Sequence, residues 1–436
     1  MVKKLFALIF IFYSSLAVAE TIKTDVLVIG NGPGAVAAAI QSSRSKLKTV
    51  LLVNGSWMPT LQGKNMITLT DNSNLPSGIW GEFRRQIHQF YKSKPAYDTT
   101  YNAPLQFEPF TGAGILKKIA DTTSRLTLKL DAPYKTVEKD GTGWEVAYTQ
   151  NGKIYYVKTK TLIDATEGNE VTKLAGASLL PPLTYNDNLY RTSIVAGDEL
   201  RVPVNSAGTP LNLTGWRFIP MGLLVVKNAD NLFVTENVLN NKPNLPMQMA
   251  IGQGAGTMAA FCAFFKTTSK NLKVRAIQSE LLDFKGYLLP FDDVNPQDRY
   301  FRAIQQVAVT GLLKGVVKNA DNQQAAYLFM PDSAVYTAEI KPVLTEIYSR
   351  AFIWFNNAKP GIKFTTKDLL SFISEITLSE PEAFRLTMQK DWKERYRFKS
   401  DFDLNHVVTR REFAILANQY LNPFARTVDL TGRIIN

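Results

Sequence analysis

The sequence predicts an α/β fold in which a domain built on a parallel sheet is followed by an all-α C-terminal domain. Residues 24–39 (TDVLVIGNGPGAVAAA) are typical of a buried strand, a glycine turn and the start of a helix, and a second apolar strand, Thr49–Val53, follows. After Lys266 the pattern becomes helical, with few strand signals. Alternating strands and helices favour parallel pairing, because parallel neighbours need a long crossover connection.

The turn after the first strand carries the motif Gly30-x-Gly32-x-x-Ala35, between a strand at Val26–Ile29 and a helix that begins over Ala35–Ile40. Gly30 permits a tight turn, Gly32 lets a pyrophosphate approach the backbone, and the small Ala35 allows the helix to pack closely on the strand. The helix start offers free N–H groups to phosphate. The motif therefore predicts a dinucleotide site, and the alternative is an ordinary strand–helix turn.

The next segments predict a long loop over residues 56–82 and helices at Gly81–Tyr91 and Thr111–Thr123. A β-meander inserted in this domain is expected to follow, with turns at residues 140–141 (DG) and 151–152 (NG). Its four predicted strands are Thr127–Leu130, Tyr134–Lys139, Gly143–Gln150 and Ile154–Thr159.

Two further buried strands are predicted at Thr161–Ala165 and Asn231–Thr235, the first followed by a helical stretch to Leu174. Residues 177–220 are irregular and rich in proline, and we expect a small substrate region here and in residues 80–110. A helix is predicted over Met247–Phe265. It contains three glycines, which are poor helix formers, so another surface or a ligand should pack tightly against it.

Residues 267–275 read as a polar linker between a domain at 20–275 and a helical domain at 276–436. The helices predicted in the second domain are Ala276–Asp283, Gln297–Thr310, Ala338–Asn356, Thr366–Ile376, Pro381–Arg395 and Thr409–Tyr420.

Residues 1–19 resemble a Sec-type signal peptide. Lys3 and Lys4 precede the apolar run Leu5–Leu16, and residues 17–19 (AVA) form a small-residue cleavage site. No cysteine lies near that site and no twin arginine precedes the run. The pattern predicts export to the periplasm or the extracellular space, and the alternative is an uncleaved anchor.

Residue counts exclude several chemistries. Cys262 is the only cysteine, so an intramolecular disulfide is impossible, and its apolar context predicts an inert core thiol. The only histidines, His88 and His406, fall in different predicted domains, which argues against a histidine metal cluster. Three aspartates at 292, 293 and 298 lack the pattern of a calcium loop and should act in loops or caps. The net charge of +12 is scattered, and no nucleic-acid-binding motif accompanies it.

Several segments, in the correct order, resemble the FAD-dependent oxidoreductases of the glutathione-reductase-like superfamily, in particular its secreted bacterial members. The resemblance covers about residues 24–315. Its segments are VIGNGPGAVAAAI (28–40), GIWGEFRRQI (78–87), QFEP (106–109), TLIDATEGNEVTKLAGA (161–177), NADNLFVTENV (228–238) and PMQMAIGQGAGTMAA (246–260).

The resemblance implies a Rossmann-like FAD-binding domain with noncovalently bound FAD. Asn54 stands where the family usually has a ribose-binding Glu, and Glu167 replaces a common glycine; these departures put FAD affinity in doubt. The start of the helix near residue 247 would point at the flavin. The cofactor-binding residues implied are Gly30, Gly32, Pro33, Gly34, Ala35, Asn54, Ala165, Thr166, Gly252 and Gly254.

The C-terminal domain resembles S-layer-homology repeats. One copy spans PFDDV (290–294), AIQQVAVTGLLKG (303–315) and FMPDSAVYTAEI (329–340), and VVTRREFAILANQYL (407–421) is similar to the end of another. In that family an arginine of this motif helps to hold cell-wall glycan; here only the second copy has one, Arg410. The resemblance implies weak glycan association, and a plain helical cap is the alternative.

Taken together, these features predict an exported oxidoreductase that transfers a hydride from an unknown small-molecule or glycan-derived substrate to FAD. His88, Arg84 and Arg85 are the candidate catalytic residues, and Arg191 and Arg217 are further candidates for binding an anionic substrate. The alternatives are a non-catalytic surface-associated protein with a degenerate dinucleotide fold and a glycan lyase, for which no base is evident.

Overall fold

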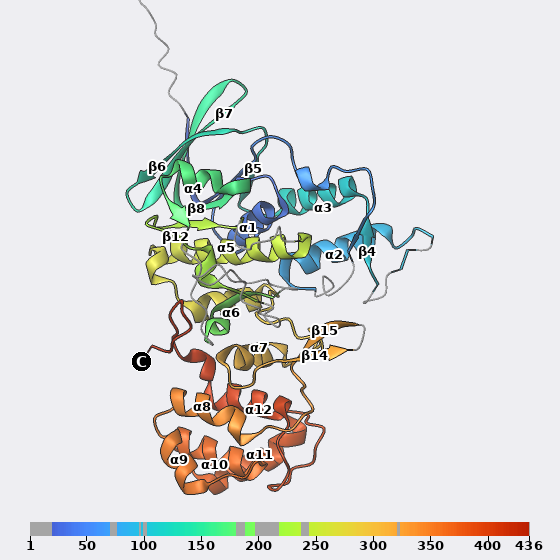
Figure 1. The fold of residues 1–436 in the computed structure, drawn as a ribbon, viewed down its shortest axis with the longest axis vertical. Helices are drawn as coiled ribbons and strands as arrows, with labels where there is room; N and C mark the ends of the chain where they lie inside the picture. Colours follow the sequence, from blue (N-terminus) through green and yellow to red (C-terminus); the bar gives the residue numbers. More distant parts are fainter. Residues whose placement is uncertain are drawn as a thin grey trace, which may run out of the picture.

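The computed structural model describes residues 20–69, 76–95, 97–98, 103–179, 188–196, 218–236, 244–320 and 323–435. The predicted signal peptide, Arg217 and most of the predicted segment 177–220 lie outside these residues. A domain with a large sheet occupies one end of the molecule and a helical bundle the other, and the chain ends between them (Figure 1).

The large sheet has the order β5-β2-β1-β8-β7-β6, and β13 pairs with β8. Five of its strands are parallel: β1 (Thr21–Gly30), β2 (Thr49–Leu52), β5 (Leu126–Lys129), β8 (Lys153–Ala165) and β13 (Leu232–Val234). The hairpin β6 (Tyr134–Asp140) and β7 (Gly143–Gln150) extends the sheet in antiparallel fashion. The predicted α/β class with a parallel sheet is therefore confirmed.

Two predictions about the meander are wrong. Its supposed first strand is β5, which pairs in parallel with β2 at the edge of the sheet. Its supposed last strand and the predicted strand 161–165 form one continuous strand, β8. The sequence pattern changes near Lys160 from a half-exposed to a fully buried segment, but β1 pairs with β8 from Tyr156 to Ala165 and keeps the backbone extended throughout.

Helices α1 (Pro33–Arg44) and α5 (Leu245–Phe265) lie side by side and run in the same direction, as the pairing of their residues shows. A Cβ atom at Gly252 would lie 2.0 Å from the carbonyl oxygen of Gly34, and one at Gly256 would lie 2.5 Å from that of Ala38. Ser42 Oγ also donates to Gly256 O at 3.2 Å. The prediction that another surface packs against the glycine-rich helix is confirmed.

Cys262 on α5 is 1% exposed, and burial raises the pKa of its thiol to about 12, with a smaller contribution from the charge of Asp230. The thiol is therefore protonated at neutral pH, as the prediction of an inert core residue requires.

Helices α2 (Gly78–Tyr91), α3 (Pro109–Thr122) and the short α4 (Glu170–Leu174) complete the helices of the sheet domain. The predicted loop 56–82 is partly structured: its described part contains a 3₁₀ turn, Pro59–Leu61, and strand β3 (Ile67–Leu69), which pairs with β4 (Leu105–Phe107). Two more short antiparallel pairs are β9 (Ser178–Leu179) with β12 (Val226–Lys227), and β10 (Ser193–Ala196) with β11 (Phe218–Pro220).

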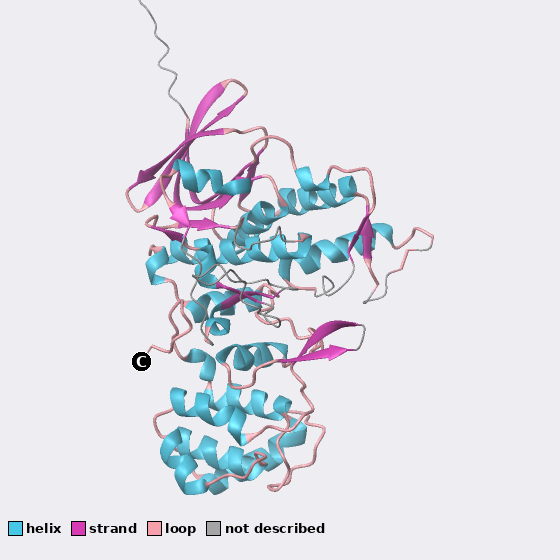
Figure 2. Ribbon diagram, in the orientation of Figure 1, coloured by secondary structure: helices cyan, strands magenta, loops and turns pink. Residues whose placement is uncertain are grey.

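The C-terminal part is mainly helical, as predicted, but it also contains a hairpin that the sequence did not indicate, β14 (Val316–Ala320) with β15 (Gln323–Leu328) (Figure 2). The predicted helix 338–356 is two helices, separated at residues 348–350. The helices are α6 (Val274–Asp283), α7 (Phe301–Thr310), α8 (Thr337–Ile347), α9 (Ala351–Ala358), α10 (Thr366–Thr377), α11 (Pro381–Glu394) and α12 (Arg410–Leu416).

The helical bundle consists of three units, each a helix, a loop and a second helix: α7 with α8, α9 with α10, and α11 with α12. The loop residues Val335, Phe364 and Val408, all fully buried, close a ring of backbone hydrogen bonds. Val335 N donates to Val408 O, Phe364 N to Val335 O, and Val408 N to Phe364 O, each at 2.9 Å. The units are therefore arranged with approximate threefold symmetry.

Candidate cofactor site

The candidate site lies at the edge of the sheet where the parallel strands β1, β2, β8 and β13 end. In doubly wound sheets this edge is where ligands bind. Helix α1 starts at Pro33, directly after β1, and α5 starts at Leu245. A Cβ atom at Gly34 would lie 3.2 Å from Gln248 O, so the first turns of the two helices meet at this edge.

The start of α1 is buried and uncapped. Its N-cap residue, Gly32, has no side chain to accept a hydrogen bond, and its first turn holds no acidic residue. Gly34 and Ala35 are buried, and a buried helix end without a cap needs another partner for its N–H groups. A Cβ atom at Gly32 would meet no atom within 4 Å. Open space therefore adjoins the positive end of the helix, which fits a diphosphate.

Two of the other predicted glycines, Gly30 and Gly252, lie in close packing contacts. A Cβ atom at Gly30 would lie 2.3 Å from Ala165 O, so glycine allows the ends of β1 and β8 to approach each other. Gly252 contacts α1 as described above, and Gly254 is buried within α5.

Asn54 and Thr166, also predicted to bind the cofactor, differ in accessibility. Asn54 is exposed just beyond the end of β2, and its backbone oxygen accepts a hydrogen bond from Asn31 Nδ2 at 3.2 Å. Thr166 is nearly buried, and its hydroxyl donates to Asp164 Oδ1 at 2.6 Å and accepts from Glu170 N at 2.9 Å.

Asp164 is a site-shaping residue that the sequence analysis missed. It is fully buried near the end of β8, and its carboxylate accepts four hydrogen bonds, from the N–H and hydroxyl groups of Thr166 and Thr172, at 2.6–3.0 Å. Burial raises the pKa of Asp164, and these bonds oppose the rise. The carboxylate fixes the loop that follows β8. The available signal was an aspartate inside the otherwise apolar run TLIDA.

The three candidate catalytic residues on α2 differ in their exposure to solvent. Arg84 is buried and His88, one turn later on the same face, is half-buried, whereas Arg85 is exposed. His88 Nδ1 lies 3.3 Å from the hydroxyl of Tyr97. Burial and the charge of Arg84 lower the pKa of His88, against a smaller effect of Asp98, so the imidazole is neutral at pH 7 and able to accept a proton.

Arg191, a predicted substrate-binding residue, has a different role. It is 2% exposed, and its guanidinium forms a bidentate ion pair with the carboxylate of Glu346, with N–O distances of 2.8 and 2.6 Å. It also donates to Thr310 O and Gly432 O. The prediction was wrong, because the guanidinium joins the sheet domain to the helical bundle and the C-terminal segment.

Arg410, the arginine of the repeat-like motif, is 4% exposed. Its guanidinium donates to Phe329 O at 2.6 Å, to Lys314 O at 2.5 Å and to the carboxylate of Glu339. The side chain therefore joins two of the three helical units and is not available to a glycan, contrary to its expected role.

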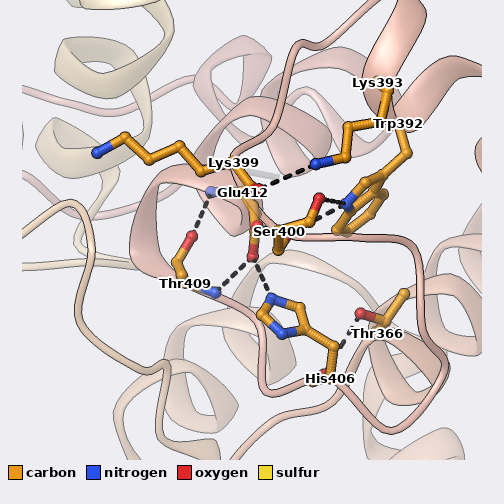
Figure 3. A network of polar contacts seen from close by, with 8 residues as sticks. All are labelled: Thr366, Trp392, Lys393, Lys399, Ser400, His406, Thr409 and Glu412. Atoms are coloured by element: carbon orange, nitrogen blue, oxygen red, sulfur yellow. Dashed lines mark hydrogen bonds and ion pairs between the residues drawn. The ribbon is translucent and has the colours of Figure 1, made fainter.

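His406 and the three aspartates have structural roles. Glu412 caps α12 and accepts hydrogen bonds from His406, Ser400 and the backbone N–H of Thr409 (Figure 3). Carboxylates of the predicted loop aspartates accept backbone N–H groups nearby, which confirms their loop and cap role; they are Asp292, Asp293 and Asp298. Within the described ranges, no group of three metal-ligating side chains occurs. Nor is any described helix long and apolar enough to span a membrane.

Comparison with known proteins finds a family match within the sheet domain. Residues 25–180 match the family model described as FAD dependent oxidoreductase. A stretch of 79 residues is 39% identical to thioredoxin reductase 2 of Arabidopsis thaliana, covering 16% of this chain and 21% of that protein. The chain thus spans about a fifth of the length of this curated relative.

Similar solved structures include the bacillithiol disulfide reductase Bdr from Staphylococcus aureus, with 14% identity, a TM-score of 0.25 and coverage of 40% of this chain and 45% of that one. Another is the anhydrotetracycline hydroxylase OxyS from Streptomyces rimosus, with 13% identity, a TM-score of 0.35 and coverage of 67% and 73%.

The family match covers most of β1 and all of α1, β2 and β8, whereas β13 and α5, which also border the site, lie outside it. Together, the match and the fold define the class of the sheet domain: it is a parallel-sheet FAD-binding domain, and FAD is its cofactor.

Proposed function

We propose that this protein is an exported FAD-dependent oxidoreductase that transfers a hydride from a small-molecule or glycan-derived substrate to flavin. The observation that carries the proposal is the buried, uncapped start of α1 beside the open space at Gly32. It lies within the residues that match the oxidoreductase family.

In this proposal, the N–H groups of Gly34 and Ala35 hold the diphosphate of FAD at the positive end of α1. The exposed amide of Asn54 supplies an acceptor for a ribose hydroxyl, one oxygen in place of the two of a carboxylate. The bound flavin supplies the redox chemistry by accepting the hydride. The protein orients the cofactor and keeps it at the sheet edge.

The substrate is proposed to meet residues 80–110 and 177–220. Neutral His88 is the candidate proton acceptor, because burial and, to a smaller extent, the charge of Arg84 lower its pKa. The exposed Arg85 is then a candidate for contact with an anionic group rather than for proton transfer.

Export and a weak association with glycan remain part of the proposal. Export is supported by the basic, apolar and small-residue pattern of residues 1–19. Because Arg410 is buried, glycan association would use another surface. An open groove of about 300 Å³ between α8 and α9 presents Thr337, Lys341 and Lys359.

The test is to purify the chain without residues 1–19, add FAD, remove the unbound cofactor and record the visible spectrum. A retained flavin band, bleached by substrate in the absence of oxygen, supports the proposal. A protein that folds but retains no FAD overturns it and favours the non-catalytic alternative.

Gly32→Val is the matched variant for this test. The backbone at residue 32 is extended and, apart from its own chain neighbours, no atom lies within 4 Å of the added Cβ, so a β-carbon is accommodated without a conflict. Its side chain would occupy the proposed diphosphate space. We expect the variant to lose FAD binding while the melting temperature of the apoprotein stays unchanged.

A further inference from the structure

Thr235 carries a buried hydroxyl beside the candidate cofactor site. The residue follows β13 and is 3% exposed, and Thr235 Oγ has no hydrogen-bond partner among the described residues. Its backbone is held in place, because Thr235 N donates to Asp164 O at 3.0 Å. A buried hydroxyl without a partner costs folding free energy, so a ligand that accepts its hydrogen bond would be stabilised.

The hydroxyl lies at the candidate cofactor site. Thr235 Oγ is 3.6 Å from the position that a Cβ atom of Gly34 would occupy, and the same position is 3.2 Å from Gln248 O. The hydroxyl is therefore beside the first turns of both α1 and α5.

Neither of these first turns contains an acidic residue. In α5 the side chain of Asn244 caps the helix by accepting from Met247 N at 3.0 Å. In α1 no side chain does so. Within the described part of the chain, the donors here without a side-chain partner are thus the N–H groups at the start of α1 and the hydroxyl of Thr235, and donors of this kind suit an anionic oxygen.

We propose that Thr235 is a cofactor-binding residue whose hydroxyl donates a hydrogen bond to a diphosphate oxygen of FAD. The proposal rests on the function proposed above and adds a contact from the end of β13 to those from α1. Valine has nearly the same shape as threonine, so Thr235→Val removes the hydroxyl without creating a cavity.

The experiment measures two quantities for each variant: the dissociation constant of FAD and the melting temperature of the apoprotein. A hydrogen bond to a charged group contributes more to the free energy of binding than one between neutral groups. Thr235→Val should therefore weaken FAD binding about tenfold or more. The melting temperature of this apoprotein should stay unchanged or rise, because an unsatisfied polar group has been removed. Thr235→Ser keeps the hydroxyl and should bind FAD within about threefold of the wild type.

Thr161→Val is the control. Thr161 is also fully buried, but its hydroxyl has a partner, Asp25 O at 3.3 Å, and it lies four residues before the end of β8. This variant should melt at a lower temperature and bind FAD normally.

The outcomes separate the two proposals. FAD binding by Thr235→Val equal to that of the wild type overturns the role of Thr235 and leaves the proposed function intact. A loss of FAD binding accompanied by a fall in apoprotein melting temperature like that of Thr161→Val also overturns it, because the hydroxyl is then structural. A wild-type protein that binds no FAD overturns both.

Discussion

Replacement of Gly252 by alanine tests the packing that brings the two helix starts together. The added Cβ atom would lie 2.0 Å from Gly34 O, whereas Cβ contacts below 3.0 Å essentially do not occur. Both groups belong to helix backbones, so the conflict is relieved only if α1 and α5 move apart by about 1 Å, which loses dispersion contacts along a buried interface. Overpacking of this kind costs about 1–3 kcal/mol of stability. Because the neighbouring atom belongs to the backbone and cannot rotate away, we expect a cost at the upper end of this range.

Alanine is the better helix former by about 1 kcal/mol, which offsets part of this cost. We therefore expect Gly252→Ala to lower the free energy of unfolding by about 2 kcal/mol. The measurement is urea unfolding of the apoprotein, followed by circular dichroism. Because Gly34 belongs to the first turn of α1, FAD binding should weaken as well.

Gly114→Ala is the matched control. Gly114 lies within α3, is exposed, and has no atom within 4 Å of an added Cβ. Here the helix preference acts alone, so the variant should be more stable by up to about 1 kcal/mol. If Gly252→Ala were as stable as the wild type, the close approach of α1 and α5 would be refuted.

Two further predictions concern the interdomain ion pair and His88. Arg191→Met should lower the free energy of unfolding by about 2–4 kcal/mol, because Glu346 and two carbonyl groups lose a buried partner. Glu346→Gln should lower it by less. Equal stability of Arg191→Met and wild type in urea unfolding would contradict the role assigned to Arg191. For His88 the folded-state pKa lies below the ordinary value of about 6.5. The unfolded chain binds the proton more readily, so stability falls as the pH decreases through 6.5 towards the folded-state pKa. Urea unfolding at a series of pH values should show a smaller fall for His88→Gln, and identical pH profiles would exclude this contribution.

Much of the cofactor site was predictable because its signals are local. The strand–turn–helix at residues 24–39 shows its burial pattern and its glycines within one short stretch, and the structure places β1 and α1 there. The helices near the C-terminus were also predicted, since their helical sequence pattern is local.

The errors arose where a distant partner decides the structure. Residues 127–130 have the pattern of a meander strand, but pairing with β2 makes them an edge strand of the parallel sheet. The second helical unit was not recognised, because its loop, residues 359–365, lacks the aspartates found in the loops of the other two units and the arginine found only in the last one. Only the ring of hydrogen bonds through Phe364 shows that it is equivalent to them.

The sequence by itself determined the α/β class, the position of the glycine turn and the helical character of the C-terminal part, because each depends on neighbours within one turn or one strand. The tertiary structure alone decided the roles of individual side chains. Arg191 is of a residue type that often binds anionic ligands, but in the structure it pairs with Glu346. Gly252 lies in a motif that resembles a cofactor contact, but it packs against Gly34. Such roles depend on burial and on partners that lie more than a hundred residues away in the sequence. The local sequence therefore does not predict them.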